Sequence, residues 1–293
     1  MTWLWTTVAR KASAVQTIAN TAARNSGAVV VAIVDRACDP GHTLDLADDE
    51  RVLQALEAAD RHPGPGRAPP PPLNLVLHVQ GCKFGPLSQI ALAISHYRGP
   101  VTVLVPYMSL SAGTVLALAA DTIVMGRDAV LGPVNPVVPM PGSVATWTRF
   151  VSSADLIEAD DERAALHNKP TSTADEEVLL AAVYSRKAVA AMRSLVLRVM
   201  LARGAYTAAT ANRAVERLVG GAVPHDSVVS REDAVDTLGL NVSLHENVPH
   251  WARSLVDEAI SDRETPCRDP TQVIVALPNR PNQPPPPRDA QFA

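Results

Sequence analysis

The sequence predicts an α/β fold with a parallel sheet at its core and a helical C-terminal region. Short, β-branched apolar runs alternate with stretches of helical periodicity, as in repeated layers of strand and helix. Apolar residues make up 47% of the 293 residues and aromatic residues only 4%. The core is therefore expected to consist of small and branched aliphatic side chains, which argues against an aromatic-rich β-sandwich and against a disordered chain.

The charge and the cysteine content limit which partners and cofactors are expected. The 26 basic and 30 acidic residues leave a formal charge of −4, and no Lys/Arg run is interleaved with aromatic residues, so nucleic acid is not expected as a partner. The three cysteines, Cys38, Cys82 and Cys267, are scattered and lack the spacing of a metal site. We expect reduced thiols in a cytoplasmic protein, with no metal and no cofactor.

The pattern of apolar and charged residues over 1–27 predicts an N-terminal amphipathic helix. Arg10 and Lys11 interrupt its apolar residues, which fall short of the roughly 18 to 20 needed to cross a bilayer. Contact with a membrane surface through Trp3, Leu4 and Trp5 is the less favoured alternative to packing on the domain or on another subunit.

Residues 28–250 are expected to form one domain. Its first half shows apolar runs and helical stretches in alternation, with strands predicted at 28–37, 73–79, 101–107, 122–126 and 129–132 and helices at 48–60, 86–97 and 111–120. The proline-rich stretch 62–72 cannot form a helix or an interior strand, so it is expected to be a surface loop.

The second half of the domain has a mainly helical pattern. A capping box from Thr173 to Glu176 introduces a long helix over 174–203 that is apolar on nearly every face, which predicts that another subunit or the chain's own termini cover it. Ser230 to Asp233 repeats the capping signal for a helix that ends at Gly239. Residues 251–293 are expected to form a C-terminal extension with a disordered proline-rich tail.

The stretch from His78 to Pro136 carries the chemistry. Two short turns, within residues 78–85 and 108–114, follow successive predicted strands, and ligands bind at the carboxyl ends of parallel strands. Ser111 begins a helix there, where free backbone N–H groups could bind an oxyanion. By local pattern alone, a helix N-cap is the commoner role for such a serine.

A resemblance to a known family changes that balance. Residues 107–136, YMSLSAGTVLALAADTIVMGRDAVLGPVNP, resemble the nucleophile segment of the serine dehydrogenase proteinase family, which is related to signal peptide peptidase. LVLHVQGC (75–82) and PHDSVVSREDAVDTLGL (224–240) resemble further motifs of the family in the same order. The resemblance implies a ClpP/crotonase-like fold of repeated β-β-α layers and an oligomeric, ATP-independent serine peptidase. Ser111 would be its nucleophile, with an oxyanion hole from backbone N–H groups at Gly81, Cys82 and Ala112.

Three departures from the family pattern leave the general base open. Cys82 replaces the second glycine of a Gly-Gly pair, Gln80 replaces a proline, and Asn135 replaces a carboxylate. Signal peptide peptidases use a lysine base, and Lys169 lies in the corresponding loop before the long helix. Lys187, within that helix, is the second candidate.

His78 and the His225–Asp226 pair rank lower as bases. Two rival functions remain at this point. One is a catalytically degenerate scaffold with the same fold. The other is a crotonase-type acyl-CoA enzyme, which is disfavoured because no basic site for the nucleotide phosphates is evident.

Overall fold

The computed structural model describes residues 2–35, 46–61, 70–141, 148–165, 173–243, 247–261 and 271–278. Its centre is a five-stranded sheet in the order β5-β3-β2-β1-β9. Four strands are parallel and β9 runs antiparallel to β1 at one edge. The strands of the sheet are β1 (Val29–Asp35), β2 (Leu73–His78), β3 (Val101–Val105), β5 (Thr122–Met125) and β9 (Thr271–Ala276).

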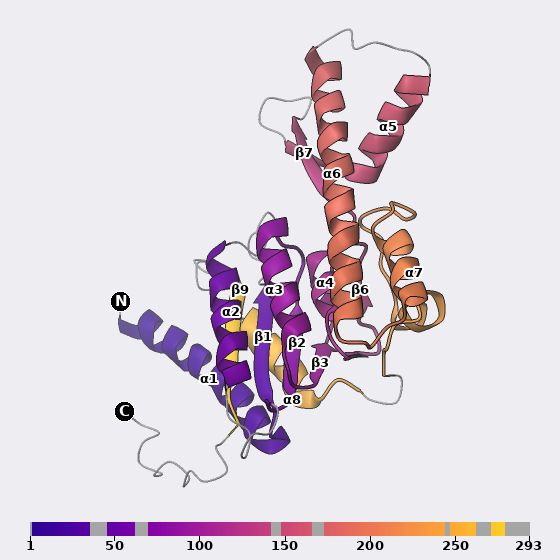
Figure 1. Cartoon of the computed structure of the whole chain (residues 1–293). Coiled ribbons are helices and arrows are strands. Elements are labelled where there is room, and N and C mark those ends of the chain that lie inside the picture. Colours follow the sequence, from indigo (N-terminus) through magenta and orange to yellow (C-terminus); the bar gives the residue numbers. More distant parts are fainter. Residues whose placement is uncertain are drawn as a thin grey trace, which may run out of the picture.

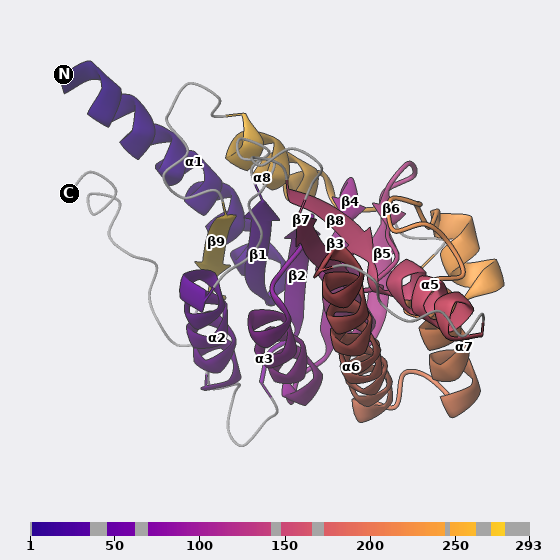
Figure 2. The same cartoon turned by 90° about the horizontal axis from the view of Figure 1, so that it is seen from above.

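Helices cover both faces of this sheet (Figure 2). On one face lie α2 (Leu46–Arg61), α3 (Phe84–His96), α4 (Ala112–Leu118) and the C-terminal half of α6 (Thr173–Ala202). On the other face lie α1 (Thr2–Ser26) and α8 (His250–Ile260). Successive β1 residues point to opposite faces, and both faces are buried, which explains why the strand is apolar throughout.

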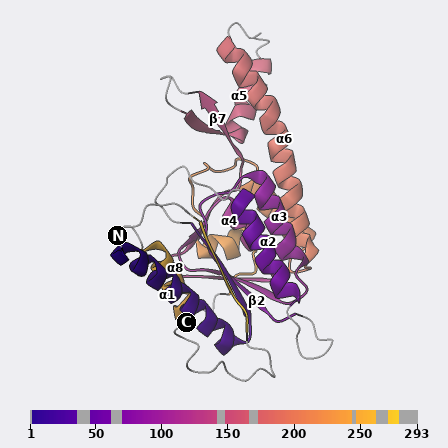
Figure 3. The same ribbon diagram turned by 90° about the vertical axis from the view of Figure 1, so that its left-hand side faces the viewer.

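A second region, which we call the handle, projects from this body (Figures 1 and 3). It consists of the hairpin β7 (Val137–Pro141) and β8 (Thr148–Ser152), helix α5 (Ser153–Ala165) and the N-terminal half of α6. Its apolar cluster is small, with Val138, Met140, Leu156 and Ala181 as buried members. The handle therefore has little core of its own.

Several short elements lie at the edge of the body, where the chain passes into the handle. Strands β4 (Met108–Ser109) and β6 (Val130–Leu131) pair in parallel, and Leu131 also pairs with Val229. Helix α7 (Ala208–Leu218) packs beside α6, and a π-helical turn, η1, spans Asp233–Thr237. These contacts bring residues 225–229 next to residues 131–135.

The sequence predicts most of the body correctly, including the long helix, observed at Thr173–Ala202. It does not predict the hairpin β7–β8, in a mixed stretch of the mainly helical half, the short strand β4, or α8 and β9 in the segment expected to be an extension. The helix expected after Ser230 is present at residues 231–237, of which Asp233–Thr237 are π-helical, and Ser230 and Asp233 cap it reciprocally. It ends before Gly239, which has the positive φ of a helix terminator. Residues 62–69 and 279–293 lie outside the described residues. In the ranges given above, no helix combines the length and apolarity that a bilayer crossing requires.

Candidate active site

Ser111 has a strained backbone. It joins β4 to α4 with φ 48° and ψ −111° and is the only residue other than glycine, in the described ranges, with a positive φ. Such a conformation costs a residue with a Cβ about 1–3 kcal/mol, so the surrounding structure must impose it. A sharp strand-to-helix turn of this kind presents the serine hydroxyl at the edge of a sheet.

Buried contacts hold the turn in place. The Thr114 Oγ1 lies 2.8 Å from the carbonyl oxygens of both Ser109 and Gly132 and accepts a hydrogen bond from the Gly132 N–H at 3.0 Å. Thr114 is fully buried, so these bonds are shielded from water. They tie the first turn of α4 to both β4 and β6. Sequence reasoning did not single out Thr114.

Two glycines make room for the turn. A Cβ on Gly113 would lie 2.9 Å from Val79 Cβ and closer still to Ser109 Oγ. A Cβ on Gly132 would lie 3.3 Å from the Ser111 nitrogen. The missing side chains therefore allow three backbone segments to meet around Ser111.

The structure places the two sequence-predicted turns side by side. Val79 forms a parallel bridge with Ser109, and the Leu110 N–H donates to the Val79 carbonyl at 2.7 Å. Gly81 follows Val79 by two residues, and Ala112 follows Leu110 by two. Neither the Gly81 nor the Ala112 N–H has a hydrogen-bond acceptor among the residues whose positions are described. Among the described residues, both groups are therefore without an acceptor at the two neighbouring turns.

The side chain of Cys82 does not strain the turn that follows β2. Neither Gly81 nor Cys82 has a positive φ, so a side chain is tolerated where the family pattern has a second glycine. Cys82 is partly buried and packs against the main hydrophobic cluster. The turn is anchored by the buried Asp35 at the end of β1, whose carboxylate accepts the Gln80 N–H at 2.8 Å. An acidic residue at the end of an apolar strand was the signal that could have revealed this anchor.

His78 belongs to the other face of the sheet. Its ring packs edge-on against Tyr107, with 6.2 Å between ring centroids, and Tyr107 packs against the cluster formed by α1 and α8. Burial lowers the pKa of His78 and so favours the neutral ring, although Asp257 acts in the opposite direction. α4 lies on the opposite side, so His78 serves the body's packing.

His225 is oriented by Asn135. The Asn135 Nδ2 donates to Ser152 Oγ at 3.1 Å, so its Oδ1 is the acceptor for His225 Nδ1 at 2.7 Å. The Nδ1 of His225 therefore carries a proton and its Nε2 is an acceptor. Burial lowers the pKa of His225, offset in part by the contact with Asn135. This chain of bonds joins residue 225 to the base of the handle.

Comparison with known proteins assigns the family. The model of the ClpP-like SDH-type serine proteinases matches residues 40–282. The chain belongs to that family. It is also similar to two uncharacterized proteins of Methanocaldococcus jannaschii, MJ0137 (29% identical over 217 residues) and MJ1495 (25% over 214). Each alignment covers 73% of this chain but only 65% and 63% of those relatives, so the chain spans slightly less than two thirds of their length.

Solved structures are similar to this chain at low identity. The 1510-N membrane-bound stomatin-specific protease is 14% identical, with a TM-score of 0.44 over 70% of this chain and 76% of that one. An enoyl-CoA hydratase/isomerase family protein from Silicibacter pomeroyi is 14% identical, with a TM-score of 0.39 over 80% of each chain. This SDH-type proteinase belongs to a ClpP-like family, and its mainly parallel central sheet confirms the predicted α/β fold class.

The two candidate lysines of this SDH-type proteinase belong to the handle or its connections. Lys169 lies outside the described residues, between the end of α5 and the start of α6. Lys187 is exposed, near the middle of α6. Two acidic residues before Lys169 have other partners: Asp160 binds Arg163 and Arg186, and Asp161 binds Arg186.

Proposed function

We propose that this SDH-type proteinase is a serine endopeptidase with Ser111 as its nucleophile. The observation that carries the proposal is the backbone of Ser111, whose strained φ and ψ are imposed by buried contacts. Strain of this kind persists where the structure must aim a particular side chain. A helix N-cap needs no such strain, since N-caps normally have extended backbone.

The proposed reaction has two stages. The Ser111 Oγ attacks the peptide carbonyl while a base takes its proton, and the N–H groups of Ala112 and of Gly81 or Cys82 stabilise the oxyanion. The amine leaves with the proton returned by the base, and water then hydrolyses the acyl-enzyme by the same route. No step consumes a nucleotide, so we propose ATP-independent hydrolysis, acting in the cytoplasm.

The proposed base is Lys169, with Lys187 as the second candidate. A lysine accepts the hydroxyl proton only when its own ammonium loses a proton near neutral pH, which requires burial or neighbouring cations. Asp160 and Asp161 form ion pairs with arginines, so these carboxylates have partners other than Lys169. The proposal requires that no carboxylate pairs with Lys169, since such a pair would keep its ammonium protonated.

A fluorophosphonate probe followed by mass spectrometry tests the nucleophile. We expect labelling at Ser111 and none in Ser111→Ala. The matched control is Ser109→Ala, two residues away, whose fully buried hydroxyl has no partner among the described residues. This control should still be labelled. Labelling at another residue, or none in the folded protein, would overturn the assignment.

Peptide hydrolysis by lysine variants tests the base. Lys169→Ala should abolish cleavage, by about 10³-fold or more, and leave folding intact. Lys187→Ala should do so only if the helical lysine is the base. If both variants cleave at the parent rate while Ser111→Ala is inactive, the lysine mechanism is wrong and His225 becomes the residue to substitute.

One observation favours a second function, a catalytically degenerate scaffold. The Asn135 amide replaces a carboxylate of the family pattern, and both ends of this amide are engaged, by Ser152 and by His225. The position thus serves to join elements in this chain. Peptide hydrolysis by the parent and by Asn135→Asp distinguishes the two functions. A scaffold is inactive in both proteins, whereas a peptidase with an intact site cleaves in both.

A further inference from the structure

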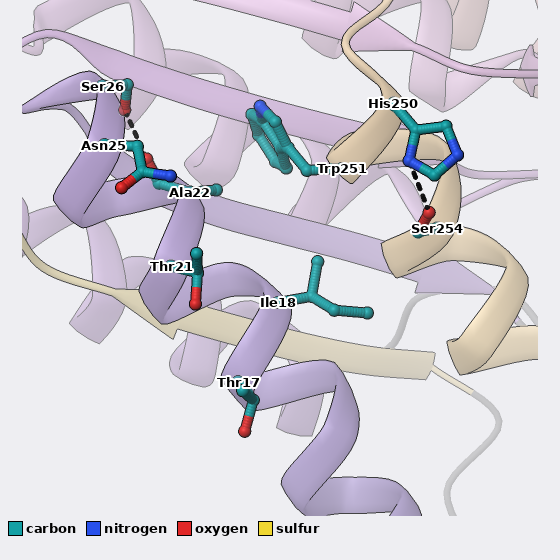
Figure 4. Close-up of a pocket in the computed structure, with 9 residues that line it drawn as sticks. All are labelled: Thr17, Ile18, Thr21, Ala22, Asn25, Ser26, His250, Trp251 and Ser254. Carbon is teal, nitrogen blue, oxygen red and sulfur yellow. Dashed lines mark hydrogen bonds between the residues drawn. The ribbon is translucent and has the colours of Figure 1, made fainter.

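A groove separates α1 from α8 on the face of the sheet away from Ser111 (Figure 4). Its volume is about 490 Å³. The floor is apolar, with Ile18 and Trp251 packed on the second hydrophobic cluster and Ala22 buried beside them. The rim is polar, formed by Thr17, Thr21, Asn25, Ser26, His250 and Ser254.

The chemistry of the groove suits an extended, uncharged segment. No carboxylate, ammonium or guanidinium group is among its described lining residues. The indole of Trp251 stands between the two helices and combines a flat apolar surface with one N–H donor (Figure 4). Proline-rich segments bind such aromatic grooves, because their polyproline II conformation costs little entropy on binding and leaves their carbonyls free to accept hydrogen bonds.

The chain itself carries such a segment, and it begins beside the groove. Strand β9 pairs antiparallel with β1 and ends at Ala276, opposite Val30, so the chain leaves the sheet near the C-terminal end of α1. Ser26 and Asn25, on the last turn of α1, line the groove. The following residues 281–287, PNQPPPP, are uncharged.

The proline-rich segment is also long enough for the groove. The ten steps from Pro278 to Arg288 in polyproline II conformation would span about 31 Å at about 3.1 Å per residue. The groove runs along α1 from Ser26 to Thr17, nine residues or about 14 Å of helix. The segment can therefore turn past the end of α1 and still follow the whole groove.

The other proline run of the chain shows the same kind of contact. At residues 70–72, the Pro71 carbonyl accepts a hydrogen bond from the Tyr97 hydroxyl at 2.7 Å. The Pro72 carbonyl accepts the Val29 N–H at 2.8 Å. Tyr97 belongs to the main hydrophobic cluster on the opposite face, so this run is already bound and is not the occupant of the groove.

We propose that the groove between α1 and α8 binds the chain's own uncharged C-terminal segment, residues 281–287, with Trp251 as the principal contact. The chain's C-terminus would then be held against α1 and α8 by a contact that does not involve Ser111. The site is thus separate from the peptidase chemistry proposed above.

Limited proteolysis of the full-length protein tests the proposal. Trypsin can cleave after Arg288, at one end of the segment, and its rate reports the fraction of time that the segment is unbound. We expect Trp251→Ala to release residues 289–293 about five- to tenfold faster than the parent, as followed by mass spectrometry. Thr21→Arg, which fills the groove from an exposed position on α1, should do the same if Trp251→Ala fails to fold. The control is Gln89→Arg, exposed on α3 across the sheet, which should cleave at the parent rate.

A second measurement identifies the occupant. The NMR signal of the Trp251 indole N–H is identified by its loss in Trp251→Phe. This signal should shift when Pro284 to Pro287 are replaced by serine. Equal cleavage rates in all variants, together with an unchanged indole signal, would overturn the proposal. A cleavage rate that rises on dilution of the parent would also overturn it, because the segment would then come from a second copy.

Discussion

The turn at Ser111 and the handle differ in how they are stabilised. The turn is enclosed by its own chain, with Thr114 buried beneath it and every nearby apolar residue of α4 buried. The handle leaves large apolar side chains in water, with Leu180 70%, Phe150 68% and Tyr184 61% exposed. One chain therefore suffices to shape the nucleophile, whereas the handle has surface that a partner could cover.

Ionic contacts replace apolar packing in the handle. Asp160, at 7% exposure, binds Arg163 and Arg186, and Arg186 also binds Asp161. The two bonds of Arg186 join α5 to α6, whereas the Asp160–Arg163 bond lies within α5. The comparison predicts that the two regions respond differently to substitution and to acid.

The largest effect is expected from Gly113→Ala. The new Cβ would lie 2.9 Å from Val79 Cβ and would collide with Ser109 Oγ, so the turn must shift. We expect a loss of about 2–3 kcal/mol in the free energy of unfolding, measured with urea, and a loss of probe labelling at Ser111. Gly85→Ala is the control, because nothing lies within 4 Å of its Cβ position. Equal stability of the two variants would show that the turn is not tightly enclosed.

The next effect concerns the handle's ion pairs. Asp160→Asn should destabilise the α5–α6 contact by about 2 kcal/mol, seen as faster hydrogen exchange in α5. Asp161→Asn, at an exposed carboxylate, should cost less than about 1 kcal/mol. If both variants exchange alike, the buried position of Asp160 is not what holds the helices together.

Acid should release the same contact. Hydrogen bonds from Arg163 and Arg186 lower the pKa of Asp160 below its ordinary value. A lowered carboxyl pKa contributes stability above the unfolded-state pKa, and this is lost as pH falls through the folded-state pKa. Exchange in α5 should therefore accelerate in the parent at pH values below the ordinary carboxyl pKa, and much less in Asp160→Asn.

A smaller effect is expected on self-association. We propose that the chain forms a homo-oligomer through the handle. Leu180→Gln should weaken self-association about tenfold, or about 1.4 kcal/mol, in light scattering at several concentrations. Val228→Gln is the control, at a residue that is 61% exposed outside the handle. A monomeric parent, or equal weakening in both variants, would contradict this use of the handle.

The smallest effect is expected from Ser111→Gly. Glycine adopts a positive φ without steric cost, so removal of the strain should raise the free energy of unfolding by about 1 kcal/mol despite the extra freedom of the unfolded chain. Ser109→Gly, in extended backbone, should lower it. A destabilised Ser111→Gly protein would mean that the turn stores no strain.

Local patterns predicted the elements of the body and the serine. The β-branched runs at β1, β2 and β3 are buried on both faces, so their apolar character is nearly continuous and easy to recognise. The hairpin β7–β8 was missed because Pro139 and Pro141 and a small apolar cluster give no alternating pattern. β9 was missed because its pairing with β1 depends on residues more than 200 positions away.

The sequence by itself determined the family, the α/β fold class and Ser111 as the candidate nucleophile, since these follow from short patterns within about 30 residues. Only the tertiary structure decided that Thr114 and two glycines hold Ser111 in a positive φ, that Asp35 anchors the neighbouring turn and that Asn135 orients His225. The physical reason is that each of these contacts joins different elements of the fold. Their geometry therefore exists only after the sheet has formed and brought its strand ends together.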